Sequence, residues 1–169
     1  MPGIFQLSKP RDLLDKLARE IERMRLAPHD ADHAFNFFVT AESLVDWLHP
    51  GDTKAQRALR ESDALLMAVS HVASSAKHYD KLYSYHQSVE STYVAGGNPV
   101  LVLYSLANFP NHPVSWHLRV HLRGSAAAGF GESINAIDLA GSVLEFWQCP
   151  TRSCNPRRRW DARQAAFRW

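Results

Sequence analysis

Polar side chains recur at helical spacing inside an otherwise apolar stretch, residues 31–48. Three or four positions separate successive members, so a helix would place them along one side: His33, Asn36, Thr40, Ser43 and Trp47. A buried polar group left without a partner costs about 1–3 kcal/mol. The row therefore predicts either a hydrogen-bonded network that fixes helix packing or a set of side chains lining a groove. In the second interpretation the binding residues are His33, Asn36, Thr40, Asp46 and Trp47.

A second candidate lies in the segment 70–78, which reads SHVASSAKH. His71 and His78 are two helical turns apart and share a face, and Ser74 lies between them. The small residues leave room above that face for a neighbouring helix or for a ligand. We therefore add Ser74 to the candidate binding residues, and we expect His33, Asn36 and the His71/His78 face to meet between the second and third helices.

Histidine clusters raise the question of metal binding. His33, His71 and His78 could form a three-histidine site between two helices. The paired Glu-x-x-His pattern of di-iron bundles is absent, as is the H-E-x-x-H pattern of zinc proteases. Cys149 and Cys154 form a C-x4-C pair without a second pair, which is a poor zinc signature. We expect no metal and no cofactor. The G-x-S-x-G and P-loop patterns are absent too.

Helices predicted from apolar periodicity must position these residues. The 3.6-residue period predicts a helix over 11–26 and a second over 31–48, with Asp30 as its N-cap. The second helix is apolar on nearly all sides, so we expect it to be central and the most buried. A third helix, capped by Asp52 or Thr53, is predicted to run to about Tyr83 or Tyr85. A break is expected near Arg60–Asp63, where Ser62 or Asp63 could cap a new start.

The period changes after Gln87. Alternation and β-branched residues predict strands over 88–94, 100–104 and 114–122. The last strand is predicted to bury one face and to expose the other, which carries Arg119 and Arg123. The segment 124–131 is predicted as a small-residue loop, followed by a helix from Glu132 or Ser133 to Gln148. The fold class is therefore α+β: an N-terminal bundle of about three helices, a three-stranded antiparallel meander and a C-terminal helix.

Composition sets the wider limits. The 169 residues are 46% hydrophobic and 21% charged, which fits one globular domain over 1–150. Six arginines and one acid make 151–169 a basic tail, whereas the first 150 residues are mildly acidic and offer no broad basic surface for nucleic acid. We expect a cytoplasmic protein with no membrane partner, because no apolar run could span a bilayer and the N-terminus does not resemble a signal peptide.

Two stretches, AFNFFVTA with a later DWL and ASSAKH, resemble a group of uncharacterised bacterial proteins. Those proteins have a helical N-terminal part with the patterns A-x-N-F-x-x-T-A…D-W and A-x-x-x-K-H. The ending AGSVLEFW fits the same group. The resemblance covers about a third of the chain by motif and implies no activity.

The Lys77–His78 end of the third helix also resembles HEPN domains, helical bundles that often cleave RNA. That resemblance implies His78 as acid/base, with Lys77 or His71 steadying phosphate charge. The family's arginine, four to six positions before its histidine, is missing here, and Arg60 lies further upstream. The leading hypothesis is therefore a domain that acts through binding, as a homodimer paired along an exposed strand edge. A HEPN-like ribonuclease acting on RNA is the alternative.

Overall fold

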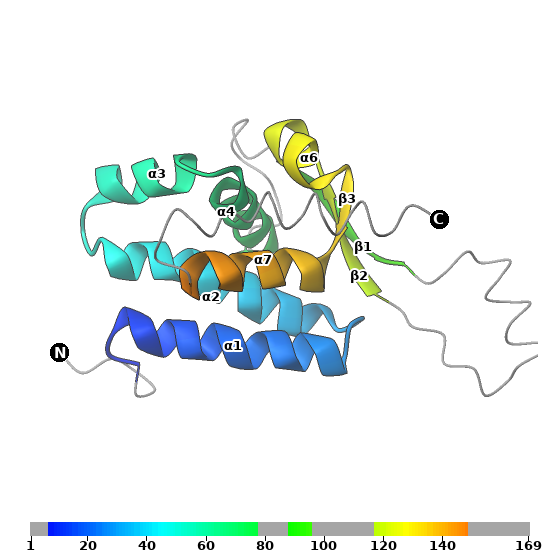
Figure 1. The fold of residues 1–169 in the computed structure, drawn as a ribbon, viewed down its shortest axis with the longest axis horizontal. Coiled ribbons are helices and arrows are strands. Elements are labelled where there is room, and N and C mark those ends of the chain that lie inside the picture. The colour runs from blue at the N-terminus through cyan, green and yellow to red at the C-terminus, as the bar shows by residue number, and fades with distance from the viewer. Residues whose placement is uncertain (1–6, 78–87, 96–116, 149–169) are drawn as a thin grey trace, which may run out of the picture.

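A computed structural model describes residues 7–77, 88–95 and 117–148. Four helices come first: α1 (Pro10–Leu26), α2 (Ala31–Leu48), α3 (Thr53–Glu61) and α4 (Ala64–Lys77). The sheet strands are β1 (Val89–Ala95), β2 (His117–Leu122) and β3 (Ser133–Asn135), with α6 (Gly124–Phe130) between β2 and β3 and α7 (Ala136–Gln148) after them (Figure 1). The predicted α+β class, with an antiparallel three-stranded sheet and a C-terminal helix, is confirmed.

Side-chain caps set where the helices begin. The Asp30 carboxylate accepts from the backbone N–H of Asp32 at the start of α2, and Asp52 accepts from Ala55 at the start of α3. Asp63 accepts from the N–H of Leu65 at 2.8 Å, which starts α4. The predicted break in the third helix is thus confirmed at 62–63.

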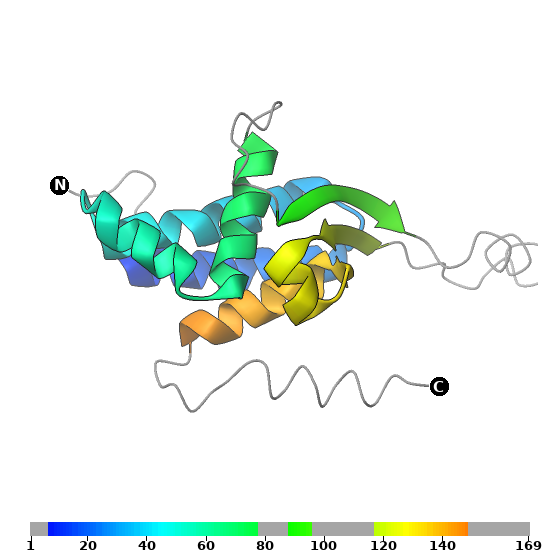
Figure 2. The ribbon, with the colours of Figure 1, turned by 90° about the horizontal axis from the view of Figure 1, so that it is seen from above.

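The helices form a layer crossed by α4. α1 and α2 lie side by side, α7 packs against both, and α4 crosses the direction of α1, α2 and α7 steeply (Figures 1 and 2). The sheet lies at one end of this layer, where α7 contacts β2 and β3 and α4 contacts β1. This arrangement brings the N-terminal half of α2, the C-terminal half of α4 and the sheet together.

α2 is central, as predicted, and packs against α1, α3, α4 and α7. Its Phe37 and Phe38 rings are buried and meet edge to face, 5.3 Å between centroids. The prediction that α2 is the most buried element is wrong. α2 and α4 each bury seven residues, but α4 has 14 residues in total and α2 has 18, so the buried fraction of α4 is higher. The prediction from apolar residues on all sides of α2 overestimated its burial, because Phe35 lies beside a cavity and is 42% exposed.

β1 and β2 pair antiparallel, with an irregular register between Val89 and Ser91, and β2 pairs antiparallel with β3. Along β2 the residues Leu118, Val120 and Leu122 are buried while their neighbours are half-buried, which confirms the predicted one-sided strand. The strand predicted over 100–104 lies outside the described residues. In the described residues β1 and β2 pair directly, and β3 is the third strand.

Two predictions after β2 are wrong. The segment predicted as a loop forms α6, because the three alanines of GSAAAGF favour a helix. Gly131, whose φ is +83°, ends this helix. The last helix begins at Ala136 instead of 132–133, since Ser133–Asn135 pairs with β2 and the Asn135 side chain accepts from the N–H of Ile137.

Within the described ranges no helix is both long and apolar enough to cross a membrane. His78, both cysteines and the tail 151–169 lie outside those ranges, so the predictions made for them stay predictions.

Replacing Phe38 by alanine should lower the free energy of unfolding by about 3–5 kcal/mol, because the ring is 2% exposed and removing it leaves a cavity in the shared core. Phe35→Ala on the same helix is the matched control and should cost much less. Chemical denaturation of both variants measures the difference, and equal costs would mean that Phe38 is not a core residue.

Candidate functional site

The polar row on α2 divides between helix packing and the surface. The Thr40 hydroxyl donates to the Asn36 carbonyl at 2.6 Å and accepts from Lys16 Nζ of α1 at 2.5 Å. Ser43 donates to the Val39 carbonyl. Both hydroxyls therefore form hydrogen bonds within α2, and that of Thr40 also bonds to α1, as the network interpretation predicts.

The other predicted residues of α2 lie in different surroundings. His33 Nε2 is 3.6 Å from Asp30 Oδ2, the Asn36 side chain is exposed, and Trp47 is half-buried against the core. Neither His33 nor Asn36 lines the two cavities described below. The structure does not bring these two residues into a described site with His71, and the shared site that includes His78 stays a prediction.

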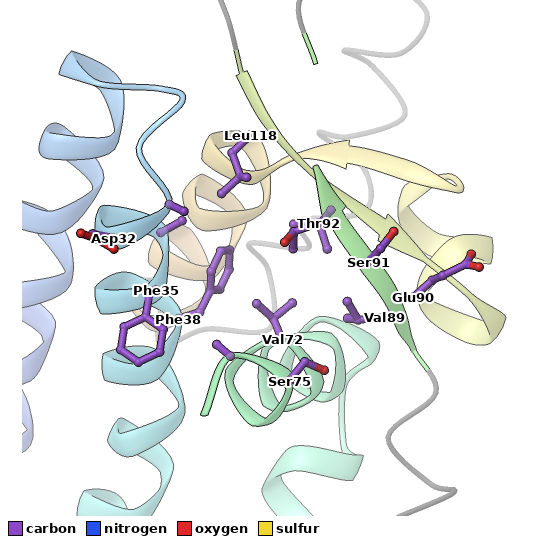
Figure 3. Close-up of a pocket in the computed structure, with 14 residues that line it drawn as sticks. Asp32, Phe35, Phe38, Val72, Ser75, Val89, Glu90, Ser91, Thr92 and Leu118 are labelled. Carbon is purple, nitrogen blue, oxygen red and sulfur yellow. The ribbon is translucent and has the colours of Figure 1, made fainter. Parts of the chain in front are cut away.

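A cavity of about 410 Å³ opens between α2, α4 and the sheet (Figure 3); it is called the α2/α4/β1 cavity here. Its walls come from the N-terminal half of α2, the last turns of α4, and the strands β1 and β2. The residues that line it are Ala31, Asp32, Ala34, Phe35, Phe38, Val72, Ser75, Ala76, Val89, Glu90, Ser91, Thr92, Leu118 and Val120.

This cavity combines an apolar floor with the hydroxyl groups of Ser75 and Thr92, whereas Ser91 lines it but turns its hydroxyl away from it (Figure 3). Phe38, Val72 and Val120 are buried core residues. Ser75 Oγ is buried and has no hydrogen-bond partner among the described residues. Thr92, on the opposite wall, turns its hydroxyl toward α2 (Figure 3). A buried hydroxyl without a hydrogen-bond partner is uncommon and destabilising, so it requires an explanation.

The sequence assigned the binding role to Ser74, but the residue at the wall is Ser75. Ser75 follows Val72 by three positions, so it shares the apolar stripe of α4 that turns toward the core. Ser74 points about 100° away from that stripe, as one helical step requires. The apolar periodicity therefore held the signal that distinguishes the two serines.

A second cavity, of about 580 Å³, lies between α3, α4 and α2; it is called the α3/α4 cavity here. Its lining residues are mostly polar: Glu42, Arg57, Arg60, Glu61, Met67, Ser70 and His71. Arg60 dominates it, with Nε donating to Glu42 Oε1 at 2.6 Å and Nη2 donating to Asp46 Oδ1 at 2.7 Å. The predicted residues Asp46 and His71 thus belong to one neighbourhood.

Electrostatics fix Arg60 in its charged form. Burial alone would lower the pKa of Arg60, but its hydrogen bonds and charge interactions with Asp46 and Glu42 outweigh burial and raise the pKa above its ordinary value. The two acids are four residues apart on α2, so they present one face to α3. Because α3 buries no residue, this ion-pair network is a main tie between α3 and α2.

The predicted catalytic residues of α4 have contrasting positions. His71 is buried, and its Nδ1 accepts from the backbone N–H of Ser88 at 3.2 Å, which assigns the ring proton of a neutral imidazole to Nε2. Lys77 is exposed at the end of α4. The α3/α4 cavity balances Arg57 and Arg60 against Glu42 and Glu61, so it offers no net positive charge to a phosphate.

In the part of the chain that the structure describes, no three histidine, cysteine or acidic residues gather as a metal site. Comparisons with known proteins find no matching family model, curated protein or solved structure. The α2/α4/β1 cavity, with its orphaned hydroxyl, is therefore the candidate site that geometry favours.

Replacing Arg60 by glutamine should loosen α3, because it leaves the largely buried Glu42 carboxylate without its cation. We expect a loss of about 1–3 kcal/mol, below the full cost of a deeply buried pair because Arg60 is 22% exposed. Arg57→Gln on the same helix should cost less than about 0.5 kcal/mol, because the Arg57 side chain is 79% exposed and its partner Glu61 is 53% exposed.

Hydrogen exchange of the α3 amides supplies the second readout. Exchange should quicken across 53–61 in Arg60→Gln while α1 and α2 keep their protection. Equal exchange in the Arg57 and Arg60 variants would contradict the assigned role of Arg60.

Proposed function

We propose that this domain binds a small, uncharged and mostly apolar molecule in the α2/α4/β1 cavity. The observation that carries the proposal is Ser75 Oγ, a buried hydroxyl at the wall of an apolar cavity that has no partner among the described residues. A ligand that hydrogen-bonds to this hydroxyl would offset the cost of burying it.

The size and the lining support this class of ligand. About 410 Å³ lies within the usual range for small-molecule sites, which are mainly apolar with a few placed polar groups. The described lining contains no lysine or arginine, and its acids are Asp32 and Glu90. An anionic ligand would therefore find no opposite charge, whereas a neutral ring with one hydroxyl could use Ser75 and Thr92.

2-Naphthol is a suitable probe because it is a neutral bicyclic ring with one hydroxyl. Saturation-transfer NMR on the full chain should detect saturable binding with a dissociation constant of about 1 mM or tighter. Ser75→Leu should abolish it by removing the hydroxyl and filling the cavity, while Ser74→Leu, the adjacent control on the same helix, should leave it unchanged. 2-Naphthoate, the same ring with a carboxylate, should bind more weakly.

Equal binding by the two leucine variants would contradict the assignment to this cavity. Binding of 2-naphthoate as tight as that of 2-naphthol would contradict the uncharged ligand class. Thermal unfolding of both variants confirms that loss of binding is not loss of the fold.

The second proposal is the homodimer expected from the sequence, formed in the cytoplasm by pairing of β1 with its copy. β1 lies at one edge of the described sheet, and its Tyr93 and Val94 are 43% and 48% exposed. Light scattering after size exclusion should give twice the 19.1 kDa chain mass. Val94→Lys should return the monomer mass, and Val94→Thr, which keeps β propensity, should not. A monomer mass for the unchanged protein at every concentration would end this proposal.

The HEPN-like ribonuclease remains the alternative, and one observation favours it: Arg60 and His71 line the same cavity. Arg60, however, is bound to Glu42 and Asp46 and is not available to stabilise a developing phosphate charge. We therefore expect no cleavage of mixed single-stranded RNA by the purified protein. Cleavage that disappears in His78→Ala would replace the binding proposal with the nuclease.

A further inference from the structure

The face of the sheet turned away from the core carries an ordered polar array. Along β2, Arg119 and His121 alternate with the buried Leu118, Val120 and Leu122. The strand register places Tyr93, Arg119 and Asn135 in one row across β1, β2 and β3. The next row holds Ser91, His121 and Ser133.

Arg119 is fixed in place by neutral groups. Its Nε donates to Ser133 Oγ and its Nη2 donates to the Ser133 carbonyl, both at 2.8 Å. The Tyr93 hydroxyl lies 3.0 Å from the same Ser133 Oγ. These contacts order the guanidinium without neutralising it, and they leave Nη1 out of the bonding. An ordered guanidinium loses less conformational entropy when it binds an anion.

Acidic groups on the sheet are engaged elsewhere. Glu90 is the only acid among the described strand residues, and it pairs with the Arg123 guanidinium and with His121 Nδ1 at 3.2 Å. Arg123 is therefore compensated, whereas no described ion pair includes Arg119. The outer face thus presents one positioned, uncompensated positive charge beside the exposed Tyr93.

We propose that this outer face binds a single-stranded nucleic acid, with Arg119 contacting a phosphate and Tyr93 stacking on a base. A planar guanidinium matches phosphate geometry, and an exposed aromatic ring next to it adds base stacking, the two contacts that sequence-tolerant strand binding combines. The site is distinct from the α2/α4/β1 cavity, which lies on the other face of β2, and it requires no cleavage.

Fluorescence anisotropy with a fluorescein-labelled, mixed-sequence single-stranded RNA tests the proposal on the full chain. Arg119→Gln should weaken binding about tenfold, and the dependence of log affinity on log salt should flatten by about 0.7–1. Arg123→Gln is the matched control, since it removes a cation from the same face that Glu90 already neutralises, and should change affinity less than about twofold. The basic tail 151–169 contributes the same background to every variant.

Three further variants separate the two contacts from folding. Arg119→Lys keeps the positive charge but loses the planar guanidinium, so its RNA affinity should lie between those of the native protein and of Arg119→Gln. Tyr93→Phe should retain affinity, while Tyr93→Leu should lose it, because stacking needs the ring and not the hydroxyl. Thermal unfolding of each variant checks the fold.

Two results would overturn the proposal. Equal weakening by Arg119→Gln and Arg123→Gln would point to nonspecific attraction by the whole chain. Displacement of the RNA by inorganic phosphate at matched phosphate concentration, with no effect of Tyr93→Leu, would point to a generic anion site without strand recognition.

Discussion

The packing of Phe38 is the contact on which the rest of the structure depends. Its ring belongs to the core that α1, α4, α7 and the sheet share, and it also forms the floor of the α2/α4/β1 cavity. Stability and the proposed ligand binding therefore depend on the same side chain. The neighbouring Phe35 is largely outside the core and lines the same cavity, so one helical turn of α2 passes from core to cavity wall.

Local periodicity predicted the parts of the fold that are local. The first two helices, the break at 62–63 and the one-sided character of β2 follow from spacing, caps and alternation. The short elements around Gly131 were missed, because three residues of β3 carry too little pattern, and α6 is a single helical stretch of small residues. β3 exists through its pairing with β2, which is a long-range fact that no window of sequence contains.

The sites were predictable only as far as single elements define them. The sequence indicated α4 and its small residues, but the binding role was predicted for Ser74 instead of Ser75. That prediction did not consider which serine lies on the same apolar stripe as Val72. Arg60 was named only at the predicted helix break and as an arginine too far upstream for the HEPN pattern, because its pairing with Glu42 and Asp46 joins residues of two different helices. Alternation predicted that Arg119 and Arg123 share the solvent-exposed face, but not that the Glu90 carboxylate pairs with Arg123 while no described ion pair includes Arg119.

Both proposed sites depend on the register of β2. Its even-numbered residues Leu118 and Val120 close the cavity, and Arg119 between them turns to the outer face. A slip of one residue would exchange the two faces, placing the guanidinium in the apolar cavity and a leucine in its place outside. Three backbone hydrogen bonds from β2 and the residue after it hold the strand against this slip: Leu118 to the Pro28 carbonyl, Leu122 to Glu132 and Arg123 to Ser88. The turn between α1 and α2, which contains Pro28, therefore helps to determine which residues lie on each face of the sheet.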